Sequence, residues 1–425
     1  MAVQKISLIT FATCIALTSV VSAQGTVVLE NLPVYDTPIT YTDPSYEVSP
    51  QKLDFTVSKV ATWGSLTDWK SKHNSSVAHI TSYEYNAVTF CPIGNHSFWV
   101  SGLTAVDKEE PDFGIYDGFP SYVSVGMSPL HVTNVVSDLD AWWTNTSDGL
   151  EAFMSFASGD FSSVTTPIDE PLTVCVPINS TTSIHVWNYY MEFYEIDVPQ
   201  SVGSFLVSYT LSDDGKTLTT YRPKKRYTQA AGFGNDYLWG KWASIKVEDY
   251  IYLYVVDVSS EGNSQDLLVA RAPVEDVMDI SSWTYYSANN ATWLTTAPEL
   301  GESRKDTLAI YSLPDDIQFA TSGESHTAGG SIFYSEYHDA YLMVFVASDD
   351  TTKYIIEYAP TPVGPWSTDR HVLYTDAYHE ITKSIFSVYA FSTPLIGEPA
   401  GKQLLISTKS KTNSSYAIMQ KLIFD

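Results

Sequence analysis

Residues 323–346 read GESHTAGGSIFYSEYHDAYLMVFV. In this stretch a polar segment with one acid, Glu324, leads into a short apolar segment, a polar turn and a second apolar segment rich in aromatic residues. A third apolar segment follows at residues 354–358, and a Gly-Pro-Trp turn at 364–366. Short segments of β-branched and aromatic residues, separated by Gly, Pro or Asp, are typical of β-strands. The stretch therefore predicts an antiparallel β-meander.

The meander pattern recurs along the chain. Copies of three to four predicted strands begin near residues 83, 172, 240, 329 and 384. This repetition predicts an all-β fold, a five-bladed β-propeller with antiparallel meander blades. A β-sandwich with appended strands and a pair of β domains are the alternatives. A helix is expected only at residues 274–280, over a turn or two.

The last copy of the meander ends after its third strand. We expect an N-terminal strand near residues 53–57 to supply the missing outer strand and so to close the ring. Closing a ring across the two termini covers strand edges that would otherwise pair with other chains. We therefore expect residues 24–425 to form a single propeller domain.

The first 23 residues are typical of a signal peptide. Lys5 supplies a positive charge, residues 6–21 are mostly apolar, and Val21-Ser22-Ala23 offers a cleavage site between small residues. No later stretch approaches the ~20 uncharged apolar residues that a membrane span needs. We therefore expect a secreted, extracellular protein.

Sequons and cysteines agree with a secretory route. Six Asn-X-Ser/Thr sequons predict N-glycosylation at Asn74, Asn95, Asn145, Asn179, Asn290 and Asn413. Cys14 is removed with the signal peptide, which leaves Cys91 and Cys175. In an oxidising compartment such a pair predicts one disulfide. Two unrelated buried thiols are the alternative.

Acidic residues outnumber basic ones. Without Lys5 the chain keeps 22 Lys and Arg against 49 Asp and Glu, a formal charge of −27. Such a field repels nucleic acid and anionic lipid, so we exclude both nucleic acid and membrane as partners. The chain also contains 29 Tyr and 11 Trp. Aromatic side chains pack sheet cores and stack on sugar rings, and composition leaves both uses open.

Two of the units resemble a known family. The segments that carry the resemblance are GKW at 240–242, YIYLY at 250–254, VARAP at 269–273, WTYY at 283–286, GSIFYS at 330–335, YIIEY at 354–358 and GPWS at 364–367. Over roughly residues 234–407 the chain resembles fungal secreted proteins of the DUF4185-like kind. The resemblance implies a five-bladed propeller similar to glycosidases that cleave arabinan-type furanosides.

The chain departs from that family at the presumed catalytic aspartates. Members that look active carry an Arg-Asp-Gly-type segment on the first inner strand and a Gly-Asp-Thr or Asp-Asp-Thr end on the next. Here the matching stretches are EYNA at 84–87 and VSGLT at 100–104, and neither aspartate is present. The resemblance thus implies either that the acids come from elsewhere or that this copy has lost them.

Acids that precede the predicted inner strands are the catalytic candidates. Glycoside hydrolysis needs two carboxyl groups, one protonated as an acid and one ionised as a base or nucleophile. In a propeller the loops leading into the innermost strands converge on the central axis, so acids on these loops can face one another. Such positions are held by Glu84, Asp236, Glu324 and Glu380, and by the pair Asp169-Glu170 before Pro171. A solvated loop carboxylate or a turn cap is the alternative role for each.

Glu324 is the strongest single candidate for the general acid, because it lies beside Ser325-His326 in a loop flanked by glycines. A carboxyl group buried in an aromatic mouth has a raised pKa, which suits an acid catalyst.

Aromatic and histidine side chains near the same loops are candidates for substrate binding. Trp239, Trp242 and Tyr237 lie at the start of the third unit and could form a platform on which sugars stack. Core packing is the alternative for both Trp side chains. His326 and His379 lie beside the candidate acids and are further binding candidates.

Other catalytic motifs are missing from the sequence. His326 and the pair His379-Glu380 could contribute to a metal site, but no close His/Asp ligand spacing stands out. We therefore expect neither a metal nor a cofactor. There is no Gly-X-Ser-X-Gly elbow for a serine nucleophile, and the Gly-rich stretch at 323–330 lacks the Lys of a phosphate loop.

These observations favour a secreted glycoside hydrolase-like protein that acts on an extracellular or cell-wall polysaccharide, with arabinan-type furanosides among the candidate substrates. The alternative is a carbohydrate-binding propeller without turnover, which the missing aspartates favour. A structural or interaction protein of the fungal wall is the third possibility. The expected partner is a carbohydrate ligand or substrate, and the expected state is a monomer.

Overall fold

The computed structural model describes the following residues, a part of them by their backbone alone: 57–65, 80–82, 88–93, 96–101, 106–107, 124–129, 140–141, 144–146, 149–151, 167–171, 175–193, 196–212, 218–221, 239–240, 242–258, 265–297, 309–313, 330–346, 353–367, 371–374, 385–391, 399–410 and 417–425. These residues form an all-β structure, as predicted. Two short 3-10 helices, η3 (Val274–Asp276) and η4 (Ile280–Ser282), lie in and beside the segment for which a helical turn was predicted. In this part of the chain no helix is long and apolar enough to cross a membrane.

Five antiparallel sheets make up most of the structure. The first sheet consists of β3 (Val88–Ile93), β4 (His96–Ser101), β6 (Ser124–Pro129) and β7 (Asp140–Ala141). The second consists of β10 (Pro167–Pro171), β11 (Val176–Pro177), β12 (Thr182–Phe193), β13 (Ile196–Leu211) and β14 (Leu218–Tyr221). The third consists of β15 (Ala243–Val247), β16 (Tyr250–Val258), β17 (Gln265–Pro273), β18 (Thr284–Ser287), β19 (Thr292–Leu294) and β20 (Tyr311–Leu313).

The fourth sheet consists of β21 (Ser331–Ser335), β22 (Ala340–Val346), β23 (Lys353–Ala359) and β24 (His371–Tyr374). The fifth consists of β25 (Ile385–Phe391), β26 (Gln403–Ser410), β27 (Ala417–Phe424) and β1 (Val57–Ser65). Two small pairs stand apart: β2 (Ile80–Ser82) with β5 (Val106–Asp107), and β8 (Thr144–Thr146) with β9 (Gly149–Glu151). Each large sheet begins close to one of the five predicted copies of the meander.

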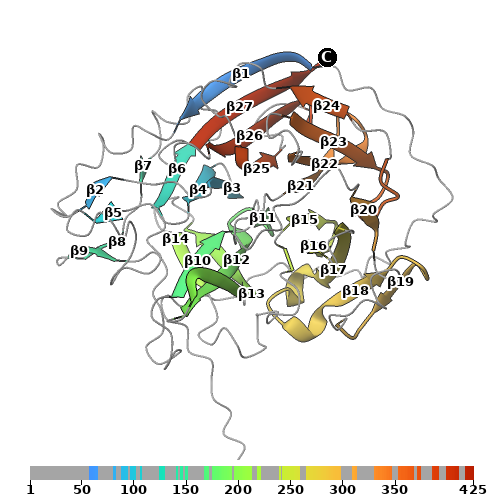
Figure 1. Ribbon diagram of the computed structural model, residues 1–425, viewed down its shortest axis with the longest axis horizontal. Coiled ribbons are helices and arrows are strands. Elements are labelled where there is room, and N and C mark those ends of the chain that lie inside the picture. The colour runs from blue at the N-terminus through green and yellow to red at the C-terminus, as the bar shows by residue number, and fades with distance from the viewer. Residues whose placement is uncertain are drawn as a thin grey trace, which may run out of the picture.

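The strand nearest to the N-terminus belongs to the last sheet. Strand β1 pairs antiparallel with β27, with Val57 opposite Phe424 and Ser65 opposite Ile418. Figure 1 shows β1 along the outer side of β27. The predicted pairing of an N-terminal strand with the last unit is thus confirmed, although β1 begins where the predicted strand ends.

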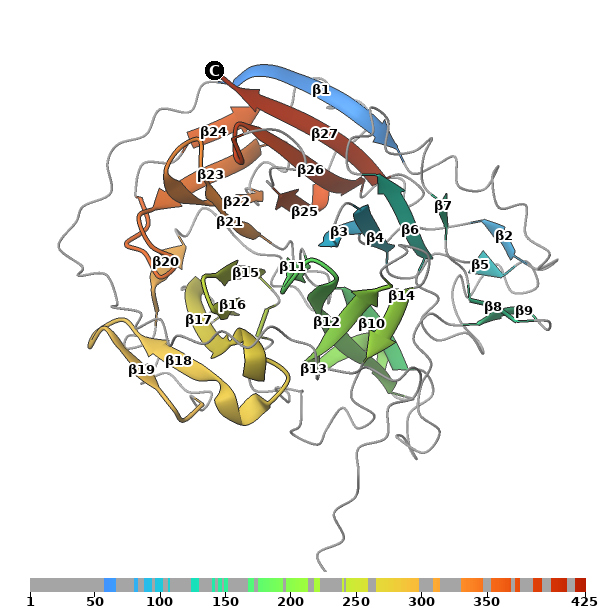
Figure 2. The ribbon, with the colours of Figure 1, turned by 180° about the vertical axis from the view of Figure 1, so that it is seen from behind.

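The sheets stand around a common centre. In both views the strands β3, β11, β15, β21 and β25 lie nearest to the middle (Figures 1 and 2). These inner strands also contact one another in sequence order: β3 with β11, β11 with β15, β15 with β21, β21 with β25, and β25 with β3. Each of these five inner strands therefore contacts two others, and the last one, β25, contacts the first one, β3.

Neighbouring sheets pack face to face because their strands are apolar on both sides. In β16, Ile251, Leu253 and Val255 enter the core shared with the second sheet. Tyr252 and Tyr254 point to the other side, into the core shared with the fourth sheet. Successive side chains of a strand alternate between its two faces, so a run that is apolar throughout fills two cores at once.

The fourth sheet repeats this arrangement. In β22, Met343 and Phe345 enter the core shared with the third sheet, while Leu342 and Val344 pack against the fifth. All four side chains are fully buried. Burial of one such side chain contributes about 1.5–3 kcal/mol, so these cores are the main stabilising contribution among the described residues.

Candidate functional site

The ends of two inner strands lie together on one face of the molecule. Lys246, the next-to-last residue of β15, donates a hydrogen bond from Nζ to the backbone oxygen of Ile178, 2.7 Å away. Ile178 directly follows β11. Burial lowers the pKa of Lys246, against a smaller opposing effect of Asp249. Since β11 and β15 are in contact and finish at the same place, they run in the same direction.

The ends of β21 and β25 lie together in the same way. The backbone nitrogen of Tyr337, in the turn after β21, donates to the backbone oxygen of Ala400, 3.0 Å away. Ala400 directly precedes β26, whose first residues pair with the end of β25. Gly401 has a φ of +92°, and a Cβ there would overlap Ser335 at the end of β21. The close approach of these two turns therefore requires glycine.

The starts of β15 and β21 lie together at the opposite face. Gly330 directly precedes β21 and Trp242 directly precedes β15. A Cβ at Gly330 would overlap the indole ring of Trp242, so only glycine allows this contact. We call the face where these inner strands begin the start face, and the opposite one the end face.

The candidate acids precede the inner strands in the sequence. Glu84 comes four residues before β3, Asp236 seven before β15, Glu324 seven before β21, and Glu380 five before β25. All four lie outside the described residues, as do Tyr237, His326 and His379. Of the strands that follow them, β15, β21 and β25 are shown to begin at the start face. The catalytic and binding roles of these residues stay predictions.

Asp169 and Glu170 have a different position from the one expected. Their position before Pro171 predicts a loop leading into an inner strand. The structure has both within β10, where they pair with Tyr189 and Asn188 of β12. The inner edge of the second sheet is split between β10 and β11, which pair with different parts of β12.

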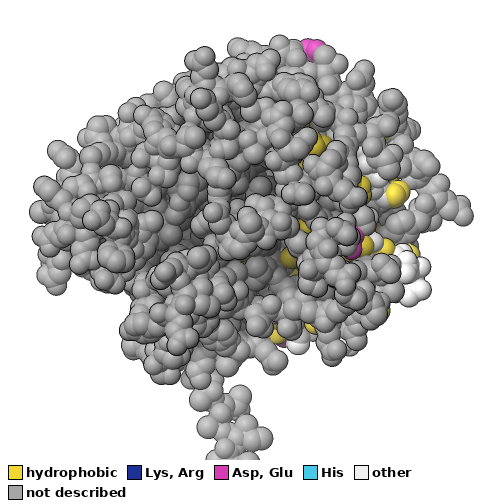
Figure 3. Space-filling view, in the orientation of Figure 1, with side chains coloured by type: hydrophobic (Ala, Val, Ile, Leu, Met, Phe, Trp, Pro, Cys, Tyr) yellow, Lys and Arg dark blue, Asp and Glu magenta, His cyan; other side chains and the backbone are white. Residues whose placement is uncertain are grey.

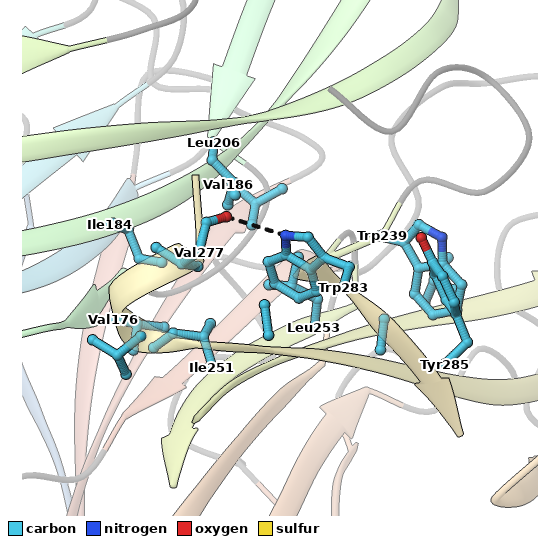
Figure 4. Packing of buried hydrophobic residues seen from close by; sticks show 14 of the residues in the cluster. Val176, Ile184, Val186, Leu206, Trp239, Ile251, Leu253, Val277, Trp283 and Tyr285 are labelled. Carbon is cyan, nitrogen blue, oxygen red and sulfur yellow. Dashed lines mark hydrogen bonds between the residues drawn. The ribbon is translucent and has the colours of Figure 1, made fainter. Parts of the chain in front are cut away.

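Trp239 lies in the core rather than on a sugar-binding platform. Its side chain is 3% exposed. Its ring lies 5.2 Å from that of Tyr285, and Figure 4 shows these two side chains next to each other. Ser204 donates a hydrogen bond to the backbone oxygen of Trp239 at 3.1 Å. The predicted stacking role is therefore corrected to core packing between the second and third sheets.

Trp242 is corrected in the same way, because its side chain is 2% exposed. Gly330 covers the indole ring, and the ring of Phe345 lies 5.8 Å away. Its backbone nitrogen donates to the backbone oxygen of Tyr254, which extends the pairing of β15 with β16. Trp242 is therefore a core residue between the third and fourth sheets, and it lies beneath the surface of the start face.

One buried carboxyl group is not among the predicted site residues. Glu357 in β23 is fully buried, and the hydroxyl of Tyr311 in β20 donates to its Oε1 at 2.6 Å. The alternation of the YIIEY segment gives the signal, because it puts Glu357 on the same apolar face as Ile355. β23 is the third strand of its sheet, and the contact links the third sheet to the fourth. Glu357 therefore has a structural role.

A buried cation was missed as well. Arg271 in β17 is 9% exposed, and its guanidinium lies 3.8 Å from the ring of Trp293 and 4.5 Å from that of Tyr250. Its Nη1 donates to the hydroxyl of Tyr252 at 3.2 Å. Such cation–π contacts stabilise a buried guanidinium. They hold the β18–β19 hairpin, which carries Trp293, against β16 and β17 of the same sheet.

A serine–histidine pair lies on the end face. Ser335 Oγ lies 2.8 Å from His338 Nδ1, and burial lowers the pKa of His338 to about 4. Ser335 is fully buried, so its hydroxyl cannot reach a substrate. The pair is therefore part of the turn between β21 and β22 and no nucleophilic site.

The described side chains offer few groups for ion binding. Among them no group of three or more His, Cys, Asp or Glu residues could hold a metal. On the face drawn in Figure 3, the described side chains that reach the surface are scattered hydrophobic and acidic ones, and no Lys or Arg of the described set is visible there.

The family comparison covers the C-terminal half of the chain. A family described as a domain of unknown function, DUF5005, matches residues 198–420. The region of resemblance found in the sequence, residues 234–407, lies within this match. The matching family is DUF5005 and not the DUF4185-like family that the motifs resemble. Among curated protein sequences none matches the chain.

Solved structures are similar to this chain to different degrees. A crystal structure of a presumed hydrolase from Bacteroides ovatus ATCC 8483 has a TM-score of 0.54 and 15% identity, and the match covers 83% of this chain and 89% of that one. A family 117 glycoside hydrolase from Zobellia galactanivorans has a TM-score of 0.43 and 9% identity, covering 82% and 87%. The GH43_1 enzyme from Xanthomonas citri, complexed with xylotriose, has a TM-score of 0.42 and 9% identity, covering 81% and 88%. The Bacteroides ovatus structure thus shares the fold of this chain over most of both lengths.

Proposed function

We propose a carbohydrate-active function for this chain, which belongs to the DUF5005 family. The proposal is a glycoside hydrolase-like protein that acts on an extracellular or cell-wall polysaccharide at the start face. Arabinan-type furanosides are among the candidate substrates. The observation that carries the proposal is the shared direction of β11, β15, β21 and β25, because three of these strands follow a candidate acid in the sequence and begin at one face.

The fold proposed with this function is a single five-bladed β-propeller over residues 24–425. Three observations support it: the five antiparallel sheets, the series of inner-strand contacts that returns to β3, and the pairing of β1 with β27. In a propeller the loops that lead into the inner strands border the central axis. The description of the Bacteroides ovatus neighbour as a presumed hydrolase agrees with a hydrolytic role.

The proposed chemistry uses two of the four candidate acids. Glu324 is the general acid that protonates the leaving oxygen. A second carboxylate, from Glu84, Asp236 or Glu380, acts as base or nucleophile. A separation of about 5 Å between the two carboxyl groups gives retention of configuration, and about 6.5–9.5 Å gives inversion.

A turnover screen of the purified protein tests this function. Plant and fungal polysaccharides, with aryl furanosides and aryl pyranosides, are incubated with the protein in mildly acidic buffer, and the product sugars are separated by chromatography. We expect release of one sugar class. Glu324→Gln should lower turnover by about 10²–10⁴-fold, the usual contribution of general acid catalysis, with glycan affinity near wild type. Wild-type turnover in this variant would exclude Glu324 as the acid.

Glu336→Gln is the matched control. Glu336 is exposed on the end face, where its Oε2 accepts a hydrogen bond from the backbone nitrogen of Ala400, which glutamine can also accept. We expect turnover within about twofold of wild type, as for most surface substitutions.

A carbohydrate-binding protein without turnover is the second candidate. It is favoured by the segments at 84–87 and 100–104, which lack the presumed catalytic aspartates of the resembled family. Retention on a glycan array together with no released sugar in the screen would support it. Release of sugar would exclude it.

The proposal includes secretion, cleavage after Ala23, a monomeric state and a disulfide between Cys91 and Cys175. Cys175 is 2% exposed and does not carry a free thiol. It directly precedes β11, which contacts β3, the strand that contains Cys91. Non-reducing peptide mapping of the secreted protein tests the pair.

A further inference from the structure

Of the six sequons, Asn179-Ser180-Thr181 has the side-chain geometry that the structure describes in most detail. The three residues form most of the tight turn between β11 and β12. The backbone nitrogens of Ile178 and Asn179 both donate to the backbone oxygen of Thr182, at 2.9 and 3.2 Å. Ser180, at the tip, is exposed, and Asn179 is partly exposed. The sequon is therefore accessible in the folded protein.

The carboxamide of Asn179 is held by its oxygen alone. Oδ1 accepts hydrogen bonds from the backbone nitrogens of Thr181 and Thr182, at 2.9 and 2.8 Å, and from the hydroxyl of Thr181 at 3.2 Å. A backbone N–H can only donate, so the atom that faces these two groups has to be the oxygen, and the orientation of the amide is settled. Nδ2 makes no hydrogen bond to any residue within the described part of the chain.

We propose that Asn179 carries an N-linked glycan on Nδ2, and that this glycan lies on the end face. The inference rests on the secretory route of the proposed function, and it does not depend on catalytic activity. The turn tolerates the modification because its hydrogen bonds use Oδ1 and leave Nδ2 free for a bond to sugar. The described residues around the end-face turns include several exposed acids, so a hydrophilic glycan fits this surface: Glu248, Glu275, Asp276, Asp279, Glu336, Asp339 and Asp425.

The modification is a transfer from a lipid-pyrophosphate-linked oligosaccharide. A bond forms between Nδ2 and C1 of the first sugar, and the bond between C1 and the pyrophosphate oxygen breaks. The lipid pyrophosphate leaves as an anion, and one Nδ2 proton passes to a base. No oxidant or reductant takes part.

The position of the glycan has a consequence for binding. Ile178, next to Asn179, accepts the hydrogen bond from Lys246 at the end of β15, so the glycan belongs to the face opposite Gly330 and Trp242. A glycan on the end face leaves the start face open to a polysaccharide. Loss of the glycan should therefore not change carbohydrate turnover or affinity.

The test is site-specific mapping of the full chain, expressed with its own leader in a eukaryotic secretory host. Peptide-N-glycosidase F in ¹⁸O water converts each glycosylated asparagine to labelled aspartate, which mass spectrometry locates. We expect label at Asn179 in the wild type and in Thr181→Ser, and none in Thr181→Ala. Thr181→Ser is the matched control because it keeps the hydroxyl donor to Oδ1 and the sequon. An unlabelled Asn179 in the wild type overturns the proposal.

A second sequon, at Asn290, shows whether a missing label at Asn179 comes from a failed secretory route or from an unmodified Asn179. Asn290 is exposed in the turn between β18 and β19, and its sequon ends at Thr292. Label at Asn290 without label at Asn179 overturns the inference while the secretory route stands. Turnover or glycan binding in Thr181→Ala within about twofold of wild type supports the end-face position, since surface substitutions rarely have larger effects. A tenfold or larger loss, with Thr181→Ser unaffected, overturns that position.

Discussion

Replacing His338 by asparagine is expected to reduce the loss of stability that the protein shows on acidification. His338 lies in the turn between β21 and β22, with its Nδ1 2.8 Å from Ser335 Oγ. Its ring meets the rings of Tyr337 and Phe424 edge-on, at 5.0 and 4.9 Å between centroids. Asparagine can still reach Ser335 with a polar atom, but it does not titrate.

The magnitude follows from the pKa of His338. Burial lowers this pKa from 6.5 to about 4 in the folded protein. The folded state thus favours the neutral ring, whereas the unfolded chain takes up a proton below about pH 6.5. The contribution to stability is complete above pH 6.5 and is lost as the pH falls toward 4. The full difference corresponds to ~3 kcal/mol at about 1.36 kcal/mol per pH unit, and solvent screening of this partly buried ring reduces it to ~1–2 kcal/mol.

The charged groups around His338 are the same in both proteins. Glu336 and Asp339 belong to its own turn, Lys402 directly precedes β26, and Asp425 directly follows β27. The Lys402 Nζ lies 5.0 Å from the ring of Tyr337. Subtracting the pH dependence of the variant from that of the wild type therefore isolates the titration of the His338 ring.

The assay is urea unfolding of wild type and His338→Asn at several pH values between 7.5 and 4. We expect the wild type to lose ~1–2 kcal/mol more of its free energy of unfolding than the variant over this range. Equal losses in the two proteins would refute the reasoning, because they would mean that the ring titrates alike in the folded and unfolded states.

Three further substitutions test the packing between sheets by urea unfolding. Tyr311→Phe removes one hydrogen bond to the buried carboxyl of Glu357 and should cost about 0.5–3 kcal/mol, the range for hydrogen bonds to neutral and charged partners. An unchanged free energy of unfolding would contradict the contribution of this bond. Gly330→Ala forces a methyl group into the ring of Trp242 and should cost about 1–3 kcal/mol, so a neutral effect would contradict the contact. Arg271→Lys keeps the positive charge but loses the planar guanidinium that stacks on its aromatic neighbours. We expect the free energy of unfolding to fall by about 0.5–2 kcal/mol. A more stable variant would contradict the cation–π contribution.

Much of the fold could be predicted because strand patterns are local. The segments at 243–247, 250–258 and 331–346 show alternating or continuous apolar runs separated by short polar turns, and each forms strands close to the predicted positions. The outer strand of the last sheet could also be predicted, since the C-terminal meander is one strand short and an unpaired edge is unfavourable.

The candidate site could be predicted only as a set of chain positions. Glu84, Asp236, Glu324 and Glu380 precede inner strands, and that relation follows from the strand pattern alone. The predicted propeller implies a shared direction of the inner strands, but only contacts between distant segments show it, such as that of Lys246 with Ile178, 68 residues apart.

The strands, their meander order and the apolar character of both sheet faces follow from local sequence patterns, because side-chain alternation depends only on neighbours along one strand. Which side chains are covered depends on tertiary contacts between sheets. Trp242 is covered by Gly330 from the next sheet, and Glu357 is hydrogen-bonded to Tyr311 from the previous one. A side chain's exposure depends on the chain segment packed against it, and that segment lies far away in the sequence.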